Sequence, residues 1–345
     1  MDAIVLDEWG GELATEEVPT PEPGPSDVAV EVRACGVTRT VENAIQGGLS
    51  DDPELTPRIP GHEFAGKVVA VGEAVEDVAV GDRVVAYFYL TCDRCDACRA
   101  GRTNQCTDFG GWYGVQRDGA YAEVATLPAA NALPLPREAS YVEGAIAADG
   151  LATPLHVCER TDLGDDDVLL VIGAAGRIGI HLCQLAVHRG ATVLAADIDP
   201  DRLKQAIEAT DGRAIPVDAL ADDLDEVIRK ATPRGGGPTV AVDTVGDVPT
   251  IRAAWDALGM GGQLVSLTTH HERAFAPLLK DFVVNESAVL GSRYATKDEV
   301  VRAARLFADG LVDPIVTETV GIDEIPGVHQ RIRSGESHGF VAMTT

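Results

Sequence analysis

The stretch that decides the fold of this chain is Val171-Ile-Gly173-Ala-Ala-Gly176-Arg-Ile-Gly179. It follows an apolar run that predicts a strand, and it opens a helical pattern that extends to about residue 189. Glycines at this point allow a tight turn and a close approach of the backbone, so that the N–H groups at the start of the helix can bind a pyrophosphate. The spacing is G-x2-G-x2-G rather than G-x-G-x2-G, so the flanking elements carry much of this prediction.

Strands alternate with helices around this glycine-rich turn. From about residue 150 to 287, apolar runs that predict strands are separated by amphipathic stretches that predict helices. Such alternation is typical of the α/β class with a doubly wound parallel sheet, the Rossmann type. The predicted strands centre on residues 168–172, 192–196, 217, 240–243 and 263–267, and the predicted helices on about 177–189, 200–209, 221–231 and 249–258.

The strand after the glycine-rich turn ends at Asp197, 18 residues beyond Gly179. A carboxylate at this place can accept hydrogen bonds from both ribose hydroxyls of NAD, and it repels the 2′-phosphate of NADP. We therefore expect an NAD(H) site. The alternative is that Asp197 only caps the helix that follows Asp199-Pro200.

The remainder of the chain is β-rich. Short apolar or alternating runs, punctuated by glycine and proline, recur from residue 1 to about 135. The tail from about 288 has one amphipathic helix, at about 297–309, and a closing strand that begins at Phe340. Because 345 residues favour two domains, we predict a β-rich domain made of residues 1–150 and 288–345 around a dinucleotide-binding domain at 151–287.

Four of the seven cysteines lie close together, at Cys92, Cys95, Cys98 and Cys106, with the spacing C-x2-C-x2-C-x7-C. Four thiolates that converge on one ion, with no open position, describe a closed structural zinc site, and we expect it in a lobe at residues 88–110. The alternative is a disulfide pair, which suits a cytosolic chain less well. A structural zinc performs no chemistry, so function must lie elsewhere.

The chain is strongly acidic, with a formal net charge of −27 from 55 Asp and Glu against 28 Lys and Arg. Such a surface repels nucleic acid and anionic membranes, so we expect neither as a partner. Self-repulsion on this scale is tolerable where molar salt screens charges beyond about 3 Å. Because only five of the basic residues are Lys, we expect a salt-loving source, the alternative being an ordinary acidic protein.

The first residues, MDAIVLDEWGGELATEE, do not place a basic segment before an apolar one. No apolar run approaches the length of a membrane span. We therefore expect no secretory signal and a cytoplasmic location.

A second motif concerns the reacting end of the molecule. Gly61-His62-Glu63 opens the phrase G-H-E-x2-G-x5-G-x2-V, which ends at Val75. A lone His is more often structural than a ligand, but the whole phrase resembles the zinc signature of the medium-chain alcohol dehydrogenases. Cys35-Gly-Val-Thr38-Arg39-Thr40 resembles the C-G-V-C-H-T of that family, and Asp118-Gly-Ala-Tyr-Ala-Glu123 resembles its D-G-x-[FY]-A-E. With the cysteines and the glycine-rich turn, the resemblance covers nearly the whole chain.

The resemblance implies a GroES-like catalytic domain, in two sequence pieces, around a Rossmann domain. It implies a structural zinc in the four-Cys lobe, a catalytic zinc, and hydride transfer between an alcohol carbon and the nicotinamide of NAD(H). A catalytic zinc polarises the carbonyl or alkoxide oxygen as a Lewis acid, and the hydroxyl that starts the proton relay corresponds to Thr40. We also expect a small-molecule substrate and a homo-oligomer, either a dimer or a tetramer.

The catalytic site departs from the family pattern. The first catalytic-zinc ligand of the family, a Cys, corresponds to Thr38, the second corresponds to His62, and the third corresponds to Asp149. Thr is a poor zinc ligand, whereas Asp is an acceptable one. A site built from His62, Asp149 and Glu63 is rich in nitrogen and oxygen donors. It would hold a zinc, hold it weakly or hold none.

The resemblance also assigns residues to the cofactor and to the proton exit. The usual relay His corresponds to Asn43, so we expect the proton to leave through water. The C-terminal basic residue that often meets the pyrophosphate corresponds to Phe340, with His338 nearby. The residues expected at the cofactor are Arg39, Thr153, Gly173, Gly176, Arg177, Ile178, Gly179, Asp197 and Arg202.

These patterns favour an NAD-dependent alcohol or polyol dehydrogenase. The runner-up is a metal-free reductase of C=C bonds in the same superfamily, of the quinone, enoyl-CoA or acryloyl-CoA type. The G-A-A-G pattern and the phrase Gly110-Gly-Trp-Tyr-Gly resemble those reductases, and Thr38 agrees with them, whereas Asp197 argues against their usual NADPH. A third hypothesis is a non-catalytic scaffold protein, which the intact cofactor residues disfavour. The aromatic residues that either line the substrate pocket or only pack the lobe are Phe88, Trp112 and Tyr113.

Overall fold

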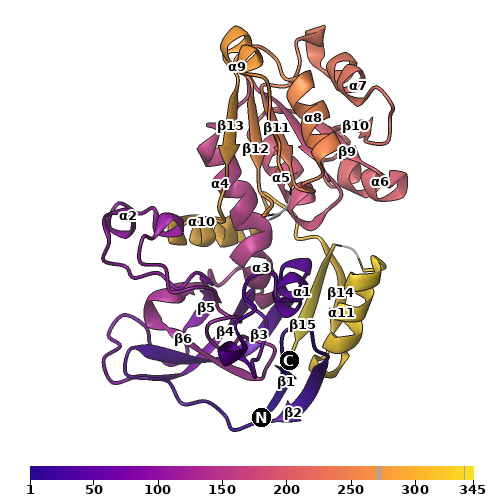
Figure 1. Cartoon of the computed structure of the whole chain (residues 1–345). Coiled ribbons are helices and arrows are strands. Elements are labelled where there is room, and N and C mark those ends of the chain that lie inside the picture. The colour runs from indigo at the N-terminus through magenta and orange to yellow at the C-terminus, as the bar shows by residue number, and fades with distance from the viewer. Residues whose placement is uncertain (270–272, 338) are drawn as a thin grey trace. The chain divides into compact units, whose positions relative to one another are not determined.

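Two compact units make up the chain. The computed structural model describes residues 1–269, 273–337 and 339–345 (Figure 1), so His338 lies outside the described residues. The first unit comprises Met1–Ala152, Ala295–Gly310 and Pro314–Thr345, and the second comprises Thr153–Tyr294 with Leu311–Asp313. Within the described ranges, no helix combines the length and the apolar character needed to cross a membrane.

The second unit contains a six-stranded parallel sheet in the order β10-β9-β8-β11-β12-β13. In chain order this is 3-2-1-4-5-6, the doubly wound topology, in which ligands bind where the strand order reverses. Leu170 of β8 lies opposite Leu194 of β9 on one side and Ala241 of β11 on the other. The strands are β8 (Val168–Ile172), β9 (Thr192–Asp197), β10 (Ile215–Asp218), β11 (Val240–Asp243), β12 (Gln263–Ser266) and β13 (Ala288–Gly291).

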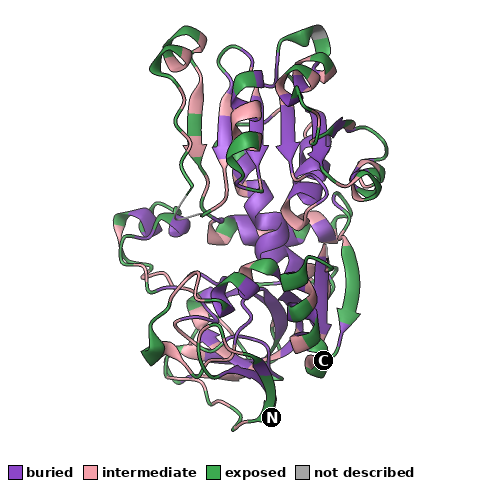
Figure 2. Cartoon of the chain, turned by 45° about the vertical axis from the view of Figure 1, so that its right-hand side comes forward, coloured by how far each residue is buried: buried purple, intermediate pink, exposed green. Residues whose placement is uncertain are grey.

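Helices cover this sheet and complete an apolar core. Trp255 and Ile228 pack with Leu170, Leu194 and Leu264 of the strands in one buried cluster. Because helices shield such a sheet from water, its central strands are apolar throughout rather than alternating, and Figure 2 shows them as buried. The helices are α4 (Ala152–Arg160), α5 (Arg177–His188), α6 (Pro200–Glu208), α7 (Leu224–Ala231), α8 (Val248–Ala257) and α9 (Leu279–Asn285), with a 3-10 turn η5 (Pro233–Gly235).

The last strand of this sheet extends the second unit beyond the expected boundary. Residues 288–294, expected in the β-rich domain, include β13, which pairs in parallel with β12. The second unit therefore runs to Tyr294. Strand β13 has four residues, and they alternate between half-buried and exposed, so its apolar signal in the sequence is weak.

The first unit is β-rich and contains both ends of the chain. Strand β3 is central, because it pairs antiparallel with β4, with β6 and with the C-terminal β15, where Met343 lies opposite Cys35. The sheet order is β14-β15-β3-β4-β5-β7, with β6 beside β3, while β1 and β2 form a separate pair. The strands are β1 (Asp2–Leu6), β2 (Leu13–Glu17), β3 (Asp27–Val37), β4 (Phe64–Val71), β5 (Arg83–Ala86), β6 (Val124–Pro128), β7 (Ala132–Pro134), β14 (Val316–Val320) and β15 (Phe340–Thr344).

The helices of the first unit position the residues that concern function. Helix α1 begins directly after Thr38, its N-cap, and a π-helical turn, η4 (Ala147–Leu151), contains Asp149. Such π turns are rare and occur frequently at functional sites. The helices are α1 (Arg39–Ile45), α2 (Asp96–Arg99), α3 (Tyr141–Ile146), α10 (Lys297–Ala308) and α11 (Ile325–Ser334), with 3-10 turns η1 (Pro53–Leu55), η2 (Thr103–Gln105), η3 (Ala129–Asn131) and η6 (Ile322–Glu324).

Candidate functional site

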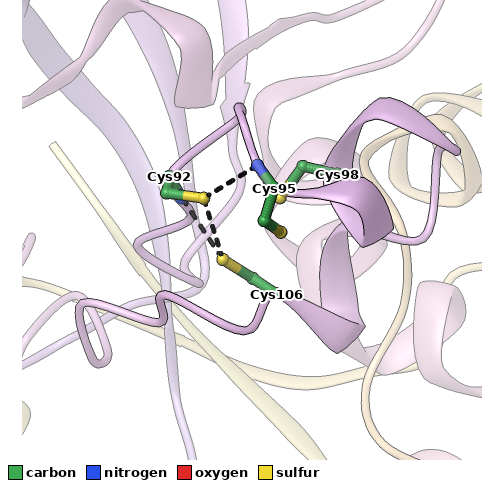
Figure 3. A group of neighbouring side chains, drawn as sticks. All are labelled: Cys92, Cys95, Cys98 and Cys106. Atoms are coloured by element: carbon green, nitrogen blue, oxygen red, sulfur yellow. Dashed lines mark hydrogen bonds between the residues drawn. The ribbon is translucent and has the colours of Figure 1, made fainter.

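The cysteines of the four-Cys lobe converge (Figure 3). The sulfur atoms of Cys92, Cys95, Cys98 and Cys106 all lie within 4.8 Å of one another, and those of Cys92 and Cys106 are 3.5 Å apart. A tetrahedral zinc with Zn–S bonds of about 2.3 Å holds its sulfurs about 3.8 Å apart, so this donor set fits zinc. All seven cysteines of the chain are free thiols, so the geometry supports zinc binding rather than a disulfide.

The backbone of the lobe favours thiolates. The N–H of Cys92 donates to Sγ of Cys106, and the N–H of Cys95 donates to Sγ of Cys92, each at 3.4 Å. Backbone hydrogen bonds from Cys98 and Thr107 lower the pKa of the Cys95 thiol to about 5. Burial raises the pKa of the Cys98 thiol instead. Because the thiolate is the form that binds a metal, the N–H donors prepare the lobe for a cation.

Lys297 ties the lobe to the start of helix α10. Its ammonium group lies 2.8 Å from both carboxylate oxygens of Asp93, which stands between the first two cysteines. Its backbone N–H donates to the hydroxyl of Thr103 at 3.0 Å, and the buried Tyr87 donates to the carbonyl of Ala295. These contacts connect segments that are distant in sequence, and no sequence motif predicted them.

A second group of ligand-type side chains is buried in the first unit: His62, Glu63 and Asp149, here called the His62 cluster. Each offers one ligand atom, and the three atoms lie within 4.8 Å of one another. His62 and Glu63 directly precede β4, whereas Asp149 comes from the π-helical turn η4. The structure thus brings together the three residues that were expected to form a second metal site.

His62 has a buried nitrogen without a hydrogen-bond partner. Among the described residues its Nε2 forms no hydrogen bond, and it lies 3.4 Å from Oε1 of Glu63. Its ring packs against Phe88, with the ring centroids 4.3 Å apart, which fixes the direction of the imidazole. An unsatisfied buried polar atom costs about 1–3 kcal/mol and is therefore rare. A buried imidazole nitrogen beside two carboxylates fits a divalent metal that accepts nitrogen and oxygen donors.

Thr38 stands where the family pattern has a thiolate. It is buried, and its hydroxyl donates to Oε1 of Glu63 at 3.3 Å. Thr38 therefore lies at the His62 cluster, but as a hydrogen-bond donor to one of the carboxylates. Thr40 follows half-buried in the first turn of α1, and Asn43 lies exposed on the same helix.

The glycine-rich turn of the second unit leads from β8 into α5. Gly173 has a φ of 78°, and an added Cβ there would collide with the side chain of Thr244. A Cβ on Gly179 would collide with the carbonyl of Gly173, so the helix lies close to the turn only because this residue is glycine. Gly176 is the N-cap of α5, which leaves the first N–H groups of that helix free of helical partners. The turn has the form of a phosphate-binding cradle.

Asp197 lies at the end of β9 beside this cradle. Its carboxylate accepts the N–H of Ala175 at 2.9 Å and the N–H of Asp199 at 3.2 Å. Arg202 donates to the carbonyl of Ala175 at 3.3 Å, so the turn and the start of α6 are held together. The N-cap of α6 is Asp199, which accepts the N–H groups of Asp201 and Arg202. Asp197 is therefore not needed as the cap of that helix.

The other residues expected at the cofactor are spread over several elements. Arg39 is exposed, and its guanidinium donates to the carbonyl of Ile332 at 3.1 Å. Thr153 is buried in α4, and Arg177 and Ile178 lie half-buried in the first turn of α5. Phe340, which corresponds to a basic residue of the family, is buried in β15.

The aromatic residues near the lobe differ in what they contact. Phe88 packs on His62 and therefore faces the site. Tyr113 is buried against Phe64, and its hydroxyl donates to the carbonyl of Thr126 at 2.9 Å, so it has the packing role. Trp112 is half-buried and forms a T-shaped ring contact with Phe109.

Two family matches agree with these features. Residues 24–137 match the family described as Alcohol dehydrogenase GroES-like domain, and residues 178–309 match the family described as Zinc-binding dehydrogenase. A GroES-like unit with a four-Cys lobe, together with a Rossmann unit with a glycine cradle, defines the class of the two-domain dehydrogenases.

Full-length relatives specify the class further. The alcohol dehydrogenase of Geobacillus stearothermophilus is 32% identical over 345 residues, which cover 99% of this chain and 98% of that protein. The L-threonine 3-dehydrogenase of Rhizobium johnstonii is 32% identical over 96% of this chain and 94% of its own. The acryloyl-coenzyme A reductase of Metallosphaera sedula is 27% identical over the whole of both chains.

A solved structure of an NAD-dependent alcohol dehydrogenase superposes with a TM-score of 0.89 at 28% identity and covers 100% of both chains. The chain therefore belongs to the zinc-binding, medium-chain alcohol dehydrogenase family, and it is an oxidoreductase.

Proposed function

We propose that this protein is an NAD-dependent dehydrogenase that transfers a hydride between an alcohol or polyol and the nicotinamide. The observation that carries this proposal is the buried Nε2 of His62, which forms no hydrogen bond with any residue that the structure describes and lies in a cluster with Glu63 and Asp149. A reductase without a catalytic metal would leave that nitrogen unsatisfied at a cost in stability. The relatives of the alcohol and threonine dehydrogenase type support the same class of reaction.

The residues that would hold a catalytic zinc are His62, Asp149 and Glu63. When bound, zinc supplies a Lewis acid that polarises the substrate oxygen. The carboxylates of Glu63 and Asp149 provide negative charge in place of the family's thiolate, and their oxygens are acceptable zinc ligands. The hydroxyl of Thr38 donates a hydrogen bond to the carboxylate of Glu63. The lone pair of Glu63 that accepts this hydrogen bond is not available to a metal. We therefore propose that this zinc is held weakly and exchanges.

Thr40 is the residue that we propose as the first proton acceptor from the substrate hydroxyl. Its place in the first turn of α1, two residues after Thr38, supports this role. Asn43 cannot pass a proton on as a His would, because a carboxamide does not titrate. The proton would therefore continue through water.

The cradle and Asp197 support NAD(H) as the cofactor. The first N–H groups of α5 can bind the pyrophosphate. The Asp197 carboxylate is fixed by two backbone N–H groups, and its remaining lone pairs can accept the ribose hydroxyls. Its negative charge disfavours a 2′-phosphate. In the lobe, the four-sulfur geometry supports a tightly held structural zinc.

A second candidate is a reductase of the acryloyl-CoA or enoyl-CoA type. The replacement of a thiolate by Thr38 supports it, since such enzymes need no catalytic metal. The relative from Metallosphaera sedula supports it as well. In that case the hydride would go from the nicotinamide to a C=C bond, and the His62 cluster would serve only the structure.

The setting of the enzyme follows from its surface. The net charge of −27 supports a protein that works at high salt. Leu279 and Val283 of α9 are largely exposed, which supports a homo-oligomer that covers them.

Metal counting together with an activity panel separates these proposals. The panel contains alcohols, polyols, L-threonine and enoyl-CoA thioesters, each with NAD(H) and NADP(H), before and after treatment with a chelator. We expect alcohol oxidation with NAD that the chelator abolishes while the zinc of the four-Cys lobe stays bound. The reductase proposal would be supported if the protein kept its activity in this panel with one zinc per chain, and if His62→Ala left that activity unchanged.

A further inference from the structure

Three polar side chains form a buried line in the first unit: Glu42 on α1, His329 on α11 and Tyr121 in the segment before β6. Nδ1 of His329 lies 2.8 Å from Oε2 of Glu42, and its Nε2 lies 3.1 Å from the hydroxyl of Tyr121. That hydroxyl donates to the carbonyl of Gly36 at 3.2 Å. The line therefore joins two helices to the end of strand β3.

The outer end of the line is held by two more side chains. Nε of Arg333 lies 3.3 Å from Oε1 of Glu42, and Gln46 donates to the same oxygen at 3.0 Å. Fully satisfied buried networks are rigid and select one arrangement of their elements. Well-packed apolar side chains of the same volume are often as stable as a buried ion pair. Stability alone therefore does not account for a carboxylate, an imidazole and a phenol in this core.

The inner end of the line touches the turn that carries His62 and the segment that leads to Thr38. The ring of Tyr121 lies against Gly61, the residue before His62, where an added Cβ would collide with it. The carbonyl of Gly36, which accepts from the Tyr121 hydroxyl, lies in the segment that leads to Thr38. The N–H of Gly36 donates to the carbonyl of Glu63 at 2.8 Å. One phenol thus connects the turn that carries His62 with the segment that leads through Thr38 into α1.

We propose that Glu42, His329 and Tyr121 are positioning residues of the dehydrogenase site. Glu42 fixes α1 through its contact with His329 of α11. Tyr121 fixes the residues that precede α1. Together they hold the hydroxyl of Thr38 at Glu63 and set the direction of Thr40. They act through α1 and the turn before β4 rather than at the reacting atoms. The catalytic part of this inference rests on the proposed function, whereas the effect on α1 does not.

Tyr121→Phe tests the inference, because it removes the hydroxyl and keeps the ring against Gly61. Tyr113→Phe is the matched control, since Tyr113 is also buried in this unit and its hydroxyl also donates to a backbone carbonyl. Tyr113→Phe loses one hydrogen bond, to Thr126, whereas Tyr121→Phe loses those to Gly36 and His329, so we expect the melting temperature to decrease in both variants and further in Tyr121→Phe. Only Tyr121→Phe should speed amide hydrogen exchange in residues 36–46. Only Tyr121→Phe should lower kcat, by about 10- to 100-fold, with KM for NAD unchanged.

Glu42 and His329 give a second test through a conservative variant. Glu42→Gln keeps an oxygen that can accept from Nδ1 of His329, but its NH2 group then faces the donors of Gln46 and Arg333, so we expect a smaller decrease in kcat than in a variant that loses the whole pair. The double variant Glu42→Leu/His329→Leu replaces the pair by apolar side chains and leaves no buried charge unpaired. We expect it to keep a melting temperature near that of the wild type while kcat falls and exchange in residues 36–46 rises.

The outcomes separate this inference from the proposed function. If Tyr121→Phe and Tyr113→Phe behave alike in kcat and in the exchange of residues 36–46, the positioning role is overturned, even if the wild type oxidises alcohols. If the wild type shows no dehydrogenase activity but the exchange difference is present, the proposed function fails and the role of the line in fixing α1 stands.

Discussion

Replacement of Thr38 by Cys should tighten metal binding at the His62 cluster. The Thr38 oxygen lies 3.3 Å from Oε1 of Glu63, and that oxygen lies 3.4 Å from Nε2 of His62. A sulfur on the same branch of the side chain would therefore stand within reach of a metal held by His62, Glu63 and Asp149. The substitution adds a thiolate, and it also releases the lone pair of Glu63 that now accepts the Thr38 hydroxyl.

The size of the effect follows from what a ligand contributes. A structural zinc site with four ligands supplies about 10–16 kcal/mol, or about 2.5–4 kcal/mol for each ligand. Part of this is offset, because the new thiol must lose its proton beside two carboxylates. We therefore expect a gain of about 2–3 kcal/mol, which is roughly a 30- to 150-fold decrease in Kd.

Metal titration in competition with a chelator of known affinity measures this Kd, in protein whose four-Cys lobe is already filled with zinc. Thr38→Ser is the matched control, because it keeps a hydroxyl and adds no thiolate, and its Kd should stay near that of the wild type. Equal Kd values for folded Thr38→Cys and Thr38→Ser would refute the reasoning that a thiolate is the donor this site lacks.

In the four-Cys lobe, Cys98→Ser should remove the zinc and loosen the contacts of Lys297 and Tyr87 with the lobe; metal analysis and a melting curve check this, and a metal-free variant of unchanged stability would contradict it. At the cofactor site, kcat/KM should be at least about tenfold higher with NAD than with NADP, a difference of about 1.4 kcal/mol. Equal or better kinetics with NADP would show that Asp197 does not exclude the 2′-phosphate. Activity and melting temperature should rise as KCl increases to about 2 M, because salt that screens beyond about 3 Å relieves the self-repulsion of the chain. Loss of structure or activity over that range would argue against adaptation to salt.

The parts of the fold that follow a regular spacing were predictable from the sequence. The glycines from Gly173 to Gly179, between an apolar strand and a helical pattern, predicted the parallel sheet and its cradle. The spacing of the cysteines predicted their convergence. Strand β13 was not predicted, because a short edge strand that is half-exposed has neither a continuous apolar run nor a clear alternation.

The site was predictable only in part. His62 and Asp149 come from segments that are far apart in the chain, so no spacing rule joins them, and the family resemblance was needed. The line from Glu42 to Tyr121 had one local signal. His329 stands on the apolar stripe of α11, beside Val328 and one turn before Ile332, where a polar residue predicts a buried partner. The identity of that partner depends on which helix packs against α11. Such a tertiary contact cannot be read from the pattern of residues in α11.

The π-helical turn that carries Asp149 has a consequence for how this family can change. A turn closed by hydrogen bonds across five residues holds one residue more than an α-helical turn. Deletion of Ala147 or Ala148, which lie between α3 and Asp149, would restore a regular α-helix. Because each residue of an α-helix advances by about 100°, the deletion would rotate the position of Asp149 about the helix axis and carry its carboxylate away from His62 and Glu63. One codon therefore separates a chain in which Asp149 lies beside His62 and Glu63 from one in which it does not.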